Sequence, residues 1–287
     1  QLADLPGMHV PAVHGDGEIT TARVIVPGFS PVRTVISGQD NAFGGAFLVE
    51  VNRGCPRGCT FCVVEHGRAT RFVPPATVLE AIPSDAIRVG LVGPAVSDHP
   101  GLPVLLAELV RRGRHVTLSS LRADRVTPEV IELLAAAGLQ TLTVAADGTS
   151  ERVREFIHKA VTTEHLLRCA ELARKAGMRR VRLYAMVGFE GETDADIDAF
   201  GDLVHSMGRF VSVAVSVSPF VPKRGTPLAD HPFLGARELQ RRVARLRRAV
   251  GGGALVRATS PREAQREWYL SHARGDEAVR RVLDLAT

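Results

Sequence analysis

Apolar residues after position 45 gather in short runs that alternate with segments of helical spacing. The runs are nearly continuous, which is typical of strands covered on both faces in a parallel sheet. The segments between them carry apolar residues three and four positions apart, as amphipathic helices do. The predicted strands are Ala46–Val51, Ile87–Gly93, His115–Ser119, Leu139–Ala145, Arg180–Val187 and Phe210–Ser218, and the predicted helices are Gly101–Arg112, Pro128–Ala137, Glu151–Ile157, Glu164–Ala176 and Asp194–Met207.

Residues that start and stop helices support these boundaries. Thr127 precedes Pro128, a cap followed by proline at the first helical position, and Gly138 and Gly177 follow helix ends. Six successive strand–helix steps predict an α/β fold, and six rather than eight favours a partial (β/α)6 TIM-like barrel. Active sites of such folds lie at the C-terminal ends of the strands, so we expect the chemistry in the loops that follow them.

The pattern divides the chain into three parts. Residues 1–45 are rich in Gly, Pro and Thr and predict a strand-and-loop lead-in, and residues 46–227 predict the partial barrel. Residues 228–287 predict a helical C-terminal extension. It opens with an Arg-rich helix, Gly235–Val250, followed by a short apolar piece, Ala254–Ala258, and two further helical stretches. The start at Gln1 rather than Met favours a chain that has lost an upstream domain.

Composition places the chain in an ordinary class of proteins. It has 287 residues, of which 45% are hydrophobic and 23% charged, as in soluble globular domains. Its apolar runs are far shorter than the ~20 residues of a membrane-spanning helix, and it does not open like a signal peptide. We therefore expect no membrane span and a cytoplasmic location. The net charge of +5 suits an anionic ligand but is too mild to indicate nucleic acid alone. A solvated face is the first interpretation of the Arg-rich helix, ahead of an acidic partner or RNA.

The strongest chemical signal is a group of three cysteines directly after the first predicted strand. Four cysteines are too few for a disulfide scaffold, and Cys55, Cys59 and Cys62 fall within eight residues. Such crowding predicts metal or cluster ligation in a reducing compartment. Thiolates at C-x₃-C-x₂-C spacing can hold three irons of a [4Fe–4S] cluster and leave the fourth open to a small molecule. Gly54 and Gly58 let the backbone fold closely around such a group.

Zinc is the alternative on spacing alone. A structural zinc site needs four ligands, and the fourth would be His66 or Cys169. Cys169 shares a predicted helix face with Leu166 and Ala170, where a small buried thiol is the common explanation. A non-catalytic zinc or Fe–S binding module therefore remains open at this point.

The cysteine segment, with Phe61 before its last cysteine, resembles the signature of the radical S-adenosylmethionine (SAM) superfamily. The resemblance runs from about Phe47 to Pro227. It is strongest to the branch whose members often carry an N-terminal cobalamin-binding domain. The stretches that carry this second likeness are Gly90–Pro100, Ser119–Asp124, Leu183–Thr193, Ser218–Pro227 and Arg274-Gly275-Asp276.

The resemblance implies a [4Fe–4S] cluster on Cys55, Cys59 and Cys62, whose open iron chelates the amino and carboxylate groups of SAM. One electron from a donor such as flavodoxin or ferredoxin then cleaves the carbon–sulfur bond, giving methionine and a 5′-deoxyadenosyl radical that abstracts hydrogen. Members with cobalamin instead methylate or rearrange a substrate. Here cobalamin would bind through a domain not in this chain, because no Asp-x-His-x-x-Gly signature is present. The substrate, whether a small molecule, a peptide or RNA, stays open.

The resemblance also implies SAM contacts after the second and third strands, each with a structural alternative. Gly93 lies in the turn that would bond the SAM amino group, or in an ordinary turn with Ser97 and Asp98 as helix caps. Ser120 and Arg122 would hold the SAM carboxylate, since an arginine grips carboxylates with two hydrogen bonds. The alternative for Arg122 is a surface salt bridge with Asp124.

Further contacts are implied after the fourth and fifth strands. Asp147 would accept hydrogen bonds from the SAM ribose, or would cap the next helix. Relatives have Pro-Glu where this chain has Ala146-Asp147. Lys159 would pair with the SAM carboxylate, or would be a solvated helix end. The residues expected to border the adenine are Tyr184, Met186 and Gly188, and Glu190 stands beside them where relatives usually have proline.

The sixth loop, Pro219–Pro227, is expected to close over the substrate, with Lys223 and Arg224 facing an anion. Its alternative is a rigid proline-rich loop. The tRNA methylthiotransferase group shares a similar loop, so an RNA-modifying radical SAM enzyme is the runner-up. That group also carries a cysteine-bearing N-terminal domain and a small C-terminal RNA-binding barrel, neither of which is evident here.

Overall fold

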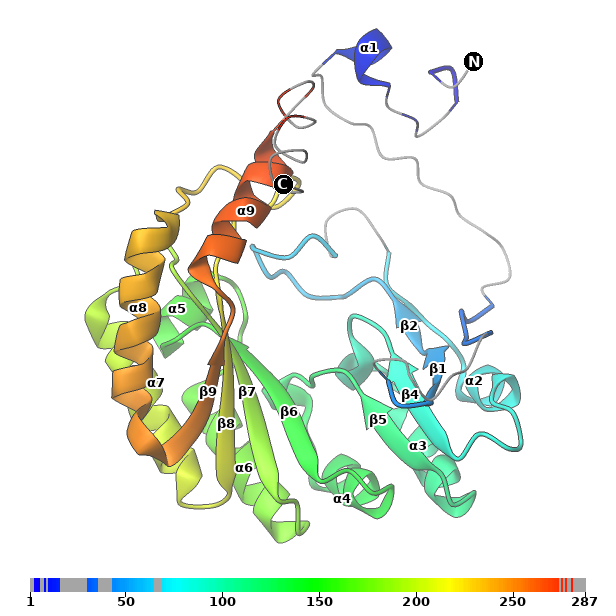
Figure 1. Ribbon diagram of the computed structural model, residues 1–287. Helices are drawn as coiled ribbons and strands as arrows, with labels where there is room; N and C mark the ends of the chain where they lie inside the picture. Colours follow the sequence, from blue (N-terminus) through cyan, green and yellow to red (C-terminus); the bar gives the residue numbers. More distant parts are fainter. Residues whose placement is uncertain are drawn as a thin grey trace.

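Parallel strands and the helices between them build the molecule (Figure 1). The structure, a computed structural model, describes residues 3–5, 8, 10–15, 30–35, 43–64, 69–273, 275, 277 and 280. The parallel strands are β1 (Phe47–Glu50), β4 (Arg88–Val92), β5 (His115–Leu118), β6 (Thr141–Asp147), β7 (Arg180–Val187), β8 (Ser212–Pro219) and β9 (Ala254–Ala258). The helices are α1 (Pro11–His14), α2 (Pro75–Ala81), α3 (Leu102–Arg111), α4 (Pro128–Ala136), α5 (Glu151–Phe156), α6 (Thr163–Lys175), α7 (Asp194–Gly208), α8 (Gly235–Val250) and α9 (Pro261–His272).

The strands pair in the order in which they occur along the chain. One sheet has the order β1-β4-β5 and a second has the order β6-β7-β8-β9, and every one of these pairings is parallel. A single parallel bridge between Leu121 and Val144 joins the two sheets. Among the described residues no pairing connects β9 back to β1. The barrel is therefore partial, as the sequence predicts.

All six predicted strands and the six predicted helices up to Val250 are present. The short apolar piece predicted at 254–258 is β9, which pairs with β8 and adds one parallel strand to the six. Helix α9 accounts for one of the two later helical stretches, and the other lies largely outside the described residues. Most of the lead-in 1–45 also lies outside the described residues.

Helix α2 was not predicted, because only Val78 of its residues is buried and its apolar period is correspondingly weak. A short antiparallel pair, β2 (Asn52–Arg53) with β3 (Arg71–Phe72), was also not predicted.

Helices cover one face of the sheets and bury the main core against it. Val181 and Leu183 of β7, for example, are fully buried in a cluster that also contains Leu105 of α3 and Phe200 of α7. Helix α8 contributes to the same cluster through residues that include Leu246. The C-terminal segment therefore shares the core of the barrel.

The opposite face is not covered in the same way. On β7 the alternate residues Arg180 and Tyr184 are exposed and Arg182 and Met186 are partly buried. The sequence prediction of strands covered on both faces is therefore only partly correct. The physical reason is that the helices that bury the main core, α2, α3, α4, α6, α7 and α8, pack on one side, and within the described residues the sheet does not close on itself.

A smaller apolar cluster lies where the strands end. Val153, Ile157, Phe189, Phe220 and Leu228 form it, and the rings of Phe189 and Phe220 stack with their centroids 4.4 Å apart. Met186, predicted to border the adenine of SAM, and Phe61 of the cysteine signature pack against it. The cluster supports the loops at this edge of the sheet.

No helix within the described ranges has both the length and the apolar content that crossing a bilayer requires.

The packing of α3 allows a matched test of the core. Replacing Leu105, which is 0% exposed, with alanine should lower the free energy of unfolding by about 2–5 kcal/mol, because it leaves a cavity in a close-packed interior. Replacing the neighbouring Val104, which is 61% exposed, should change it by less than about 0.5 kcal/mol. Urea unfolding measures both. Equal decreases in the free energy of unfolding for the two variants would contradict the assignment of Leu105 to the buried face of α3.

Candidate active site

The three cysteines lie on a single loop that follows β1 and β2. Cys59 is buried, Cys55 and Cys62 are partly buried, and all three are free thiols. The backbone N–H of Cys62 donates to the carbonyl of Cys59 at 3.1 Å, which makes a tight turn. Gly54 opens the loop at φ +77°, and a Cβ on it would lie 3.0 Å from the carbonyl oxygen of Ala69. Glycine is therefore required there, because a side chain has neither the backbone conformation nor the space.

Two cations stand near the buried thiol. Nη1 of Arg122 lies 3.9 Å from Sγ of Cys59. Burial raises the pKa of the Cys59 thiol, while the positive charges of Lys159 and Arg122 act in the opposite direction. Since the thiolate is the form that binds metal, these cations favour the ligand state of Cys59.

Arg122 is buried and connects several loops. Its Nη2 donates to the carbonyl of Lys159 at 2.6 Å and its Nε to Oδ1 of Asp124 at 3.0 Å. Its backbone N–H donates to Oγ of Ser97 at 3.1 Å. The ion pair with Asp124 predicted as an alternative is therefore present, but it is part of a buried network rather than the surface. Ser120, two residues earlier, is partly buried.

Asp147 and Lys159 form an ion pair with 2.5 Å between Oδ2 and Nζ. Asp147 ends β6 at φ 60°, next to a shift in strand register, and Lys159 lies between two residues with left-handed backbone, His158 and Ala160. Ser150, not Asp147, caps α5, so the capping alternative for Asp147 is wrong. Lys159 is 6% exposed, so the alternative of a solvated helix end is wrong as well.

A fully buried arginine holds this turn in place. Nε of Arg154 donates to the carbonyl of Val161 at 2.6 Å, and its Nη2 donates to Oγ1 of Thr163 at 2.8 Å. Left-handed residues other than glycine are strained and persist where the surroundings fix them. Arg154 provides part of that fixation and so helps to present Lys159.

The loop after β4 contacts the cysteine loop directly. Oδ1 of Asp98 accepts hydrogen bonds from Arg57, which lies between the first two cysteines, and from Arg125 at 3.1 Å. Neither Ser97 nor Asp98 caps a helix, because the N-cap positions here are Ala95 and Gly101 without side-chain caps. The capping alternative for these two residues is therefore wrong.

Asn52 supports the turn at Gly93. A Cβ on Gly93 would lie 2.2 Å from Oδ1 of Asn52, so only glycine fits beside that side chain. The same amide accepts from the N–H of Ala95 at 3.3 Å and donates to the carbonyl of Gly54 at 2.8 Å. Sequence reasoning did not find Asn52, because a single polar residue in a strand region carries no periodic signal.

The residues predicted around the adenine lie at the end of β7. Tyr184 is 38% exposed, and Gly188 is buried at φ +104°. A Cβ on Gly188 would lie 2.4 Å from Leu239 of α8, so this glycine allows α8 to pack closely. Its N–H donates to Oε2 of Glu192 at 2.7 Å.

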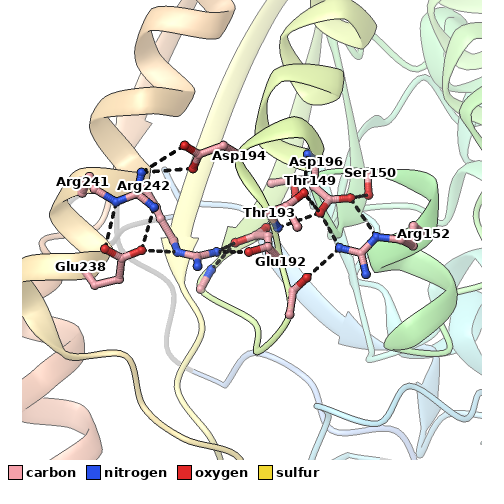
Figure 2. Close-up of polar contacts among 12 residues, drawn as sticks. Thr149, Ser150, Arg152, Glu192, Thr193, Asp194, Asp196, Glu238, Arg241 and Arg242 are labelled. Carbon is pink, nitrogen blue, oxygen red and sulfur yellow. Dashed lines mark hydrogen bonds and ion pairs between the residues drawn. The ribbon is translucent and has the colours of Figure 1, made fainter.

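Glu192 is the centre of a polar network that joins three elements (Figure 2). It accepts from Oγ1 of Thr149 at 2.5 Å and from Nη1 of Arg242 at 2.9 Å. Burial raises the pKa of Glu192, and these donors act against that rise. Sequence reasoning missed Glu192 because its side-chain partners, Thr149 and Arg242, are more than forty residues away along the chain.

Lys223 and Arg224 do not face an open anion site. Lys223 pairs with Glu267 of α9, and Arg224 donates to the backbone carbonyl of His272 at the end of α9. The sixth loop is therefore tied to the C-terminal helix, and the interpretation of these two cations as anion ligands is wrong. The physical reason is that α9 follows β9 back to the same edge of the sheet.

Cys169 is not placed to complete a zinc site. It is buried on α6, its thiol donates to the carbonyl of Ala123 at 3.7 Å, and burial raises its pKa to about 12. His66, the other proposed fourth ligand, lies outside the described residues, as do Arg274 and Asp276. Within the described ranges no group of three or more His, Cys, Asp or Glu side chains is arranged to hold a metal ion.

The comparison with protein families decides the affiliation of the chain. The profile described as "Radical SAM superfamily" matches residues 49–204, which include the cysteine loop, Arg122, Asp147 and Lys159. The chain belongs to the radical SAM superfamily. Its members are enzymes, so the resemblance predicted from the cysteine motif is confirmed at the level of the family. Membership implies a [4Fe–4S] cluster and SAM as cofactors.

Curated relatives of this radical SAM chain include an uncharacterised archaeal protein and tRNA-modifying enzymes. An uncharacterised protein of Methanocaldococcus jannaschii is 34% identical over 207 residues, which cover 69% of this chain and 45% of the relative. A tRNA-2-methylthio-N(6)-dimethylallyladenosine synthase of Cereibacter sphaeroides is 30% identical over 225 residues, covering 72% of this chain and 50% of the relative. The chain thus spans about half the length of these relatives.

Solved radical SAM structures share the fold. SuiB of Streptococcus suis bound to S-adenosylmethionine gives a TM-score of 0.55 at 16% identity, covering 74% of this chain and 50% of that one. The methyltransferase TsrM of Kitasatospora setae, with cobalamin and a [4Fe–4S] cluster bound, gives 0.52 at 20% identity, covering 64% and 36%. At these identities the likeness extends to the fold alone.

Asp196, in the first turn of α7, should make the stability of the fold depend on pH. It accepts hydrogen bonds from Ser150 and Arg152 and closes a capping box with Thr193 (Figure 2). Burial alone would raise its pKa, but these donors lower the pKa well below the usual range. A depressed carboxyl pKa stabilises the fold above the unfolded value and loses that effect as the pH falls.

Asp196→Asn should therefore lower the free energy of unfolding by about 2 kcal/mol near neutral pH. The difference from wild type should shrink below about pH 4, where the unfolded carboxylate binds its proton. Asp198→Asn, on the same helix but in an exposed pair with Arg245, is the control and should have little effect. Urea unfolding across the pH range measures both, and a difference independent of pH would rule out the ionic role.

Proposed function

We propose that this chain is the core of a radical SAM enzyme that carries a [4Fe–4S] cluster on Cys55, Cys59 and Cys62. The observation that carries the proposal is the buried Cys59 thiol beside Arg122, on the loop that follows the first parallel strand. Three free thiols on one loop are the kind and number of ligands that such a cluster takes, and binding would have to bring their sulfurs closer together than they are in this structure. We assign the partial barrel to residues 46–227 and the extension that packs on it to residues 228–287.

Unpartnered atoms support the fit of these loops to a bound group. In the described part of the chain, Oγ1 of Thr60 and Oδ2 of Asp98 are buried oxygens without a hydrogen-bond partner. One lies on the cysteine loop and the other on the loop after β4. A buried polar atom without a partner is costly, so a ligand that supplies donors here would relieve that cost.

When bound and reduced, the cluster supplies one electron that cleaves SAM to methionine and a 5′-deoxyadenosyl radical, which takes hydrogen from a substrate. The residues of this chain bind and orient the cofactor for that step. The ammonium group of Lys159 has three N–H donors, of which one is directed at Asp147. The other two are available for the SAM carboxylate. Ser120 and Arg122 are proposed to hold the same carboxylate.

The remaining contacts predicted with SAM are hydrogen bonds to its ribose and amino groups and packing against its adenine. Asp147 is proposed to accept from the ribose hydroxyls and the backbone at Gly93 to accept from the amino group. The small apolar cluster at the strand ends is proposed to limit access of water to this region. The residues proposed to border the adenine are Phe61, Tyr184, Met186 and Gly188.

Replacing Cys55, Cys59 or Cys62 with alanine should abolish SAM cleavage and lower the iron content after anaerobic reconstitution, because each removes one cluster ligand. Cys169→Ala is the matched control and should keep both, since that thiol is buried away on α6. The readouts are iron content, EPR of the reduced protein with and without SAM, and 5′-deoxyadenosine formation. Cleavage retained in one of the first three variants would refute that ligand assignment.

A second candidate is a tRNA-modifying radical SAM enzyme. It is favoured by the 30% identity to tRNA-2-methylthio-N(6)-dimethylallyladenosine synthases and by the net charge of +5. Arginines of α8 give it little support, because Arg241 and Arg245 pair with Asp194 and Asp198.

If RNA is the substrate, the chain should bind tRNA with an affinity that falls steeply as salt rises from about 50 to about 200 mM, because phosphate contacts release counterions. Filter binding at both salt concentrations measures this. An affinity for tRNA no greater than for an unrelated duplex DNA would count against an RNA substrate.

Cobalamin-linked methylation or rearrangement is the corresponding proposal for the branch that the sequence resembles. It rests on the stretches around Gly90–Pro100 and Leu183–Thr193. It requires a corrinoid domain outside residues 1–287.

A further inference from the structure

The face of β6–β9 that points away from the helices has a composition of its own. Alternate residues of these strands, such as Leu142, Leu183 and Val215, are buried against the helices, so the residues between them point to the other side. We call this other side the inner face. Its residues are Thr141, Thr143 and Ala145 of β6, Arg180, Arg182 and Tyr184 of β7, Ser212, Ala214 and Ser216 of β8, and Leu255 and Arg257 of β9.

The inner face is not filled by its own side chains. The interior of a closed (β/α)8 barrel is packed with layers of bulky branched residues. Here the strand register places Tyr184 between Ala145 and Ser216, and Arg182 between Thr143 and Ala214, so small residues flank each large one. Tyr184 remains 38% exposed and Leu255 56% exposed. Part of this face is therefore open to solvent.

Three arginines, Arg180, Arg182 and Arg257, give this face its charge. Ser216 of β8 pairs in register with Tyr184 on one side and Arg257 on the other, and Arg182 lies two residues before Tyr184 on β7. At about 4.8 Å between strands and about 3.3 Å per residue, the Cα atoms of Arg182 and Arg257 are about 12 Å apart. Arginine side chains are long enough for both guanidinium groups to reach the space in front of Ser216.

The charges of Arg182 and Arg257 are not compensated. Within the described ranges the side chains of Arg182 and Arg257 have no ion pair or hydrogen bond, as is true of the exposed Arg248 of α8, whereas Arg242 and Arg245 of α8 are paired with carboxylates. Asp147 is the acidic residue nearest in register, and it is paired with Lys159. An arginine that points over small neutral residues is suited to an anion, because its planar fork matches carboxylate and phosphate groups.

We propose that the substrate is a small molecule bearing a phosphate or carboxylate group, held on the inner face by Arg182 and Arg257. This inference rests on the proposed radical SAM function and assigns the chemical class of its substrate. Proteins that bind the nucleic-acid backbone neutralise many phosphates with lysine and arginine, whereas the inner face of β6–β9 has three arginines, so a small anion fits better than RNA.

The test is calorimetric titration of the reconstituted chain with pyrophosphate and, separately, with citrate. Wild type should bind at least one of them at a single site, and the arm that responds identifies phosphate or carboxylate as the preferred group. Arg182→Gln and Arg257→Gln should each weaken that binding by about tenfold or more, because each removes a charge-assisted hydrogen bond. Both side chains are at least partly exposed, and thermal unfolding verifies that the variants fold.

Arg248→Gln is the matched control, because Arg248 is an exposed arginine of α8 on the opposite side of the sheet. It should bind the anion as wild type does. The proposal is overturned if neither anion binds, or if the two inner-face variants bind as well as the control. It is also overturned if single-stranded RNA of about ten nucleotides displaces pyrophosphate and binds far more tightly, since that makes RNA the occupant.

EPR of the same wild-type preparation with and without SAM separates this inference from the proposed function. A cluster signal that SAM does not perturb would refute the radical SAM function, whatever the anion titration gives. A SAM-perturbed signal without anion binding would refute the substrate class alone.

Discussion

The arrangement of the loops at the C-terminal ends of the parallel strands depends on the hydrogen bonds made by the buried guanidinium group of Arg122. This group reaches Sγ of Cys59 on the first loop, the carbonyl of Lys159 beyond the fourth parallel strand, and Asp124 beside it. Its backbone N–H adds Ser97 from the second loop. Parallel strands bring all these loops to one edge, but they do not fix the distances between them. One planar, permanently charged group with five donors fixes several of those distances at once.

Burying so many charges at one edge is tolerable because nearly all of them are satisfied in pairs. Asp147 is matched to Lys159, Arg57 to Asp98 and Arg242 to Glu192. A buried charge without a partner would cost several kcal/mol. The side chains of Arg182 and Arg257, for which the structure gives no partner, are partly or fully exposed on the inner face, where water solvates their charge.

Much of this architecture could be predicted from the sequence, because strands and helices leave periodic apolar patterns. The cysteine loop could be singled out too, since its spacing matches the signature of the radical SAM superfamily. What the pattern did not reveal depends on single residues with distant partners. Asn52 closes on Gly93, and Gly188 is required by Leu239 some fifty residues later. Neither contact has a local signal. Lys223 had a plausible chemical role in sequence, but a C-terminal helix whose position the sequence does not specify supplies its partner.

The order of the strands has a consequence for how the chain acquires its structure. Each parallel strand pairs with the parallel strand that precedes it along the chain, except that β6 meets the first sheet only through the bridge between Leu121 and Val144. A sheet built in this order can grow at one edge while the polypeptide is still being synthesised, each strand and its helix docking on a finished neighbour. No early strand has to wait for a late one to occupy a central position. The cysteine loop therefore belongs to the part of the sheet that is completed first, and the metallocofactor could be inserted before the last arginine of the inner face leaves the ribosome.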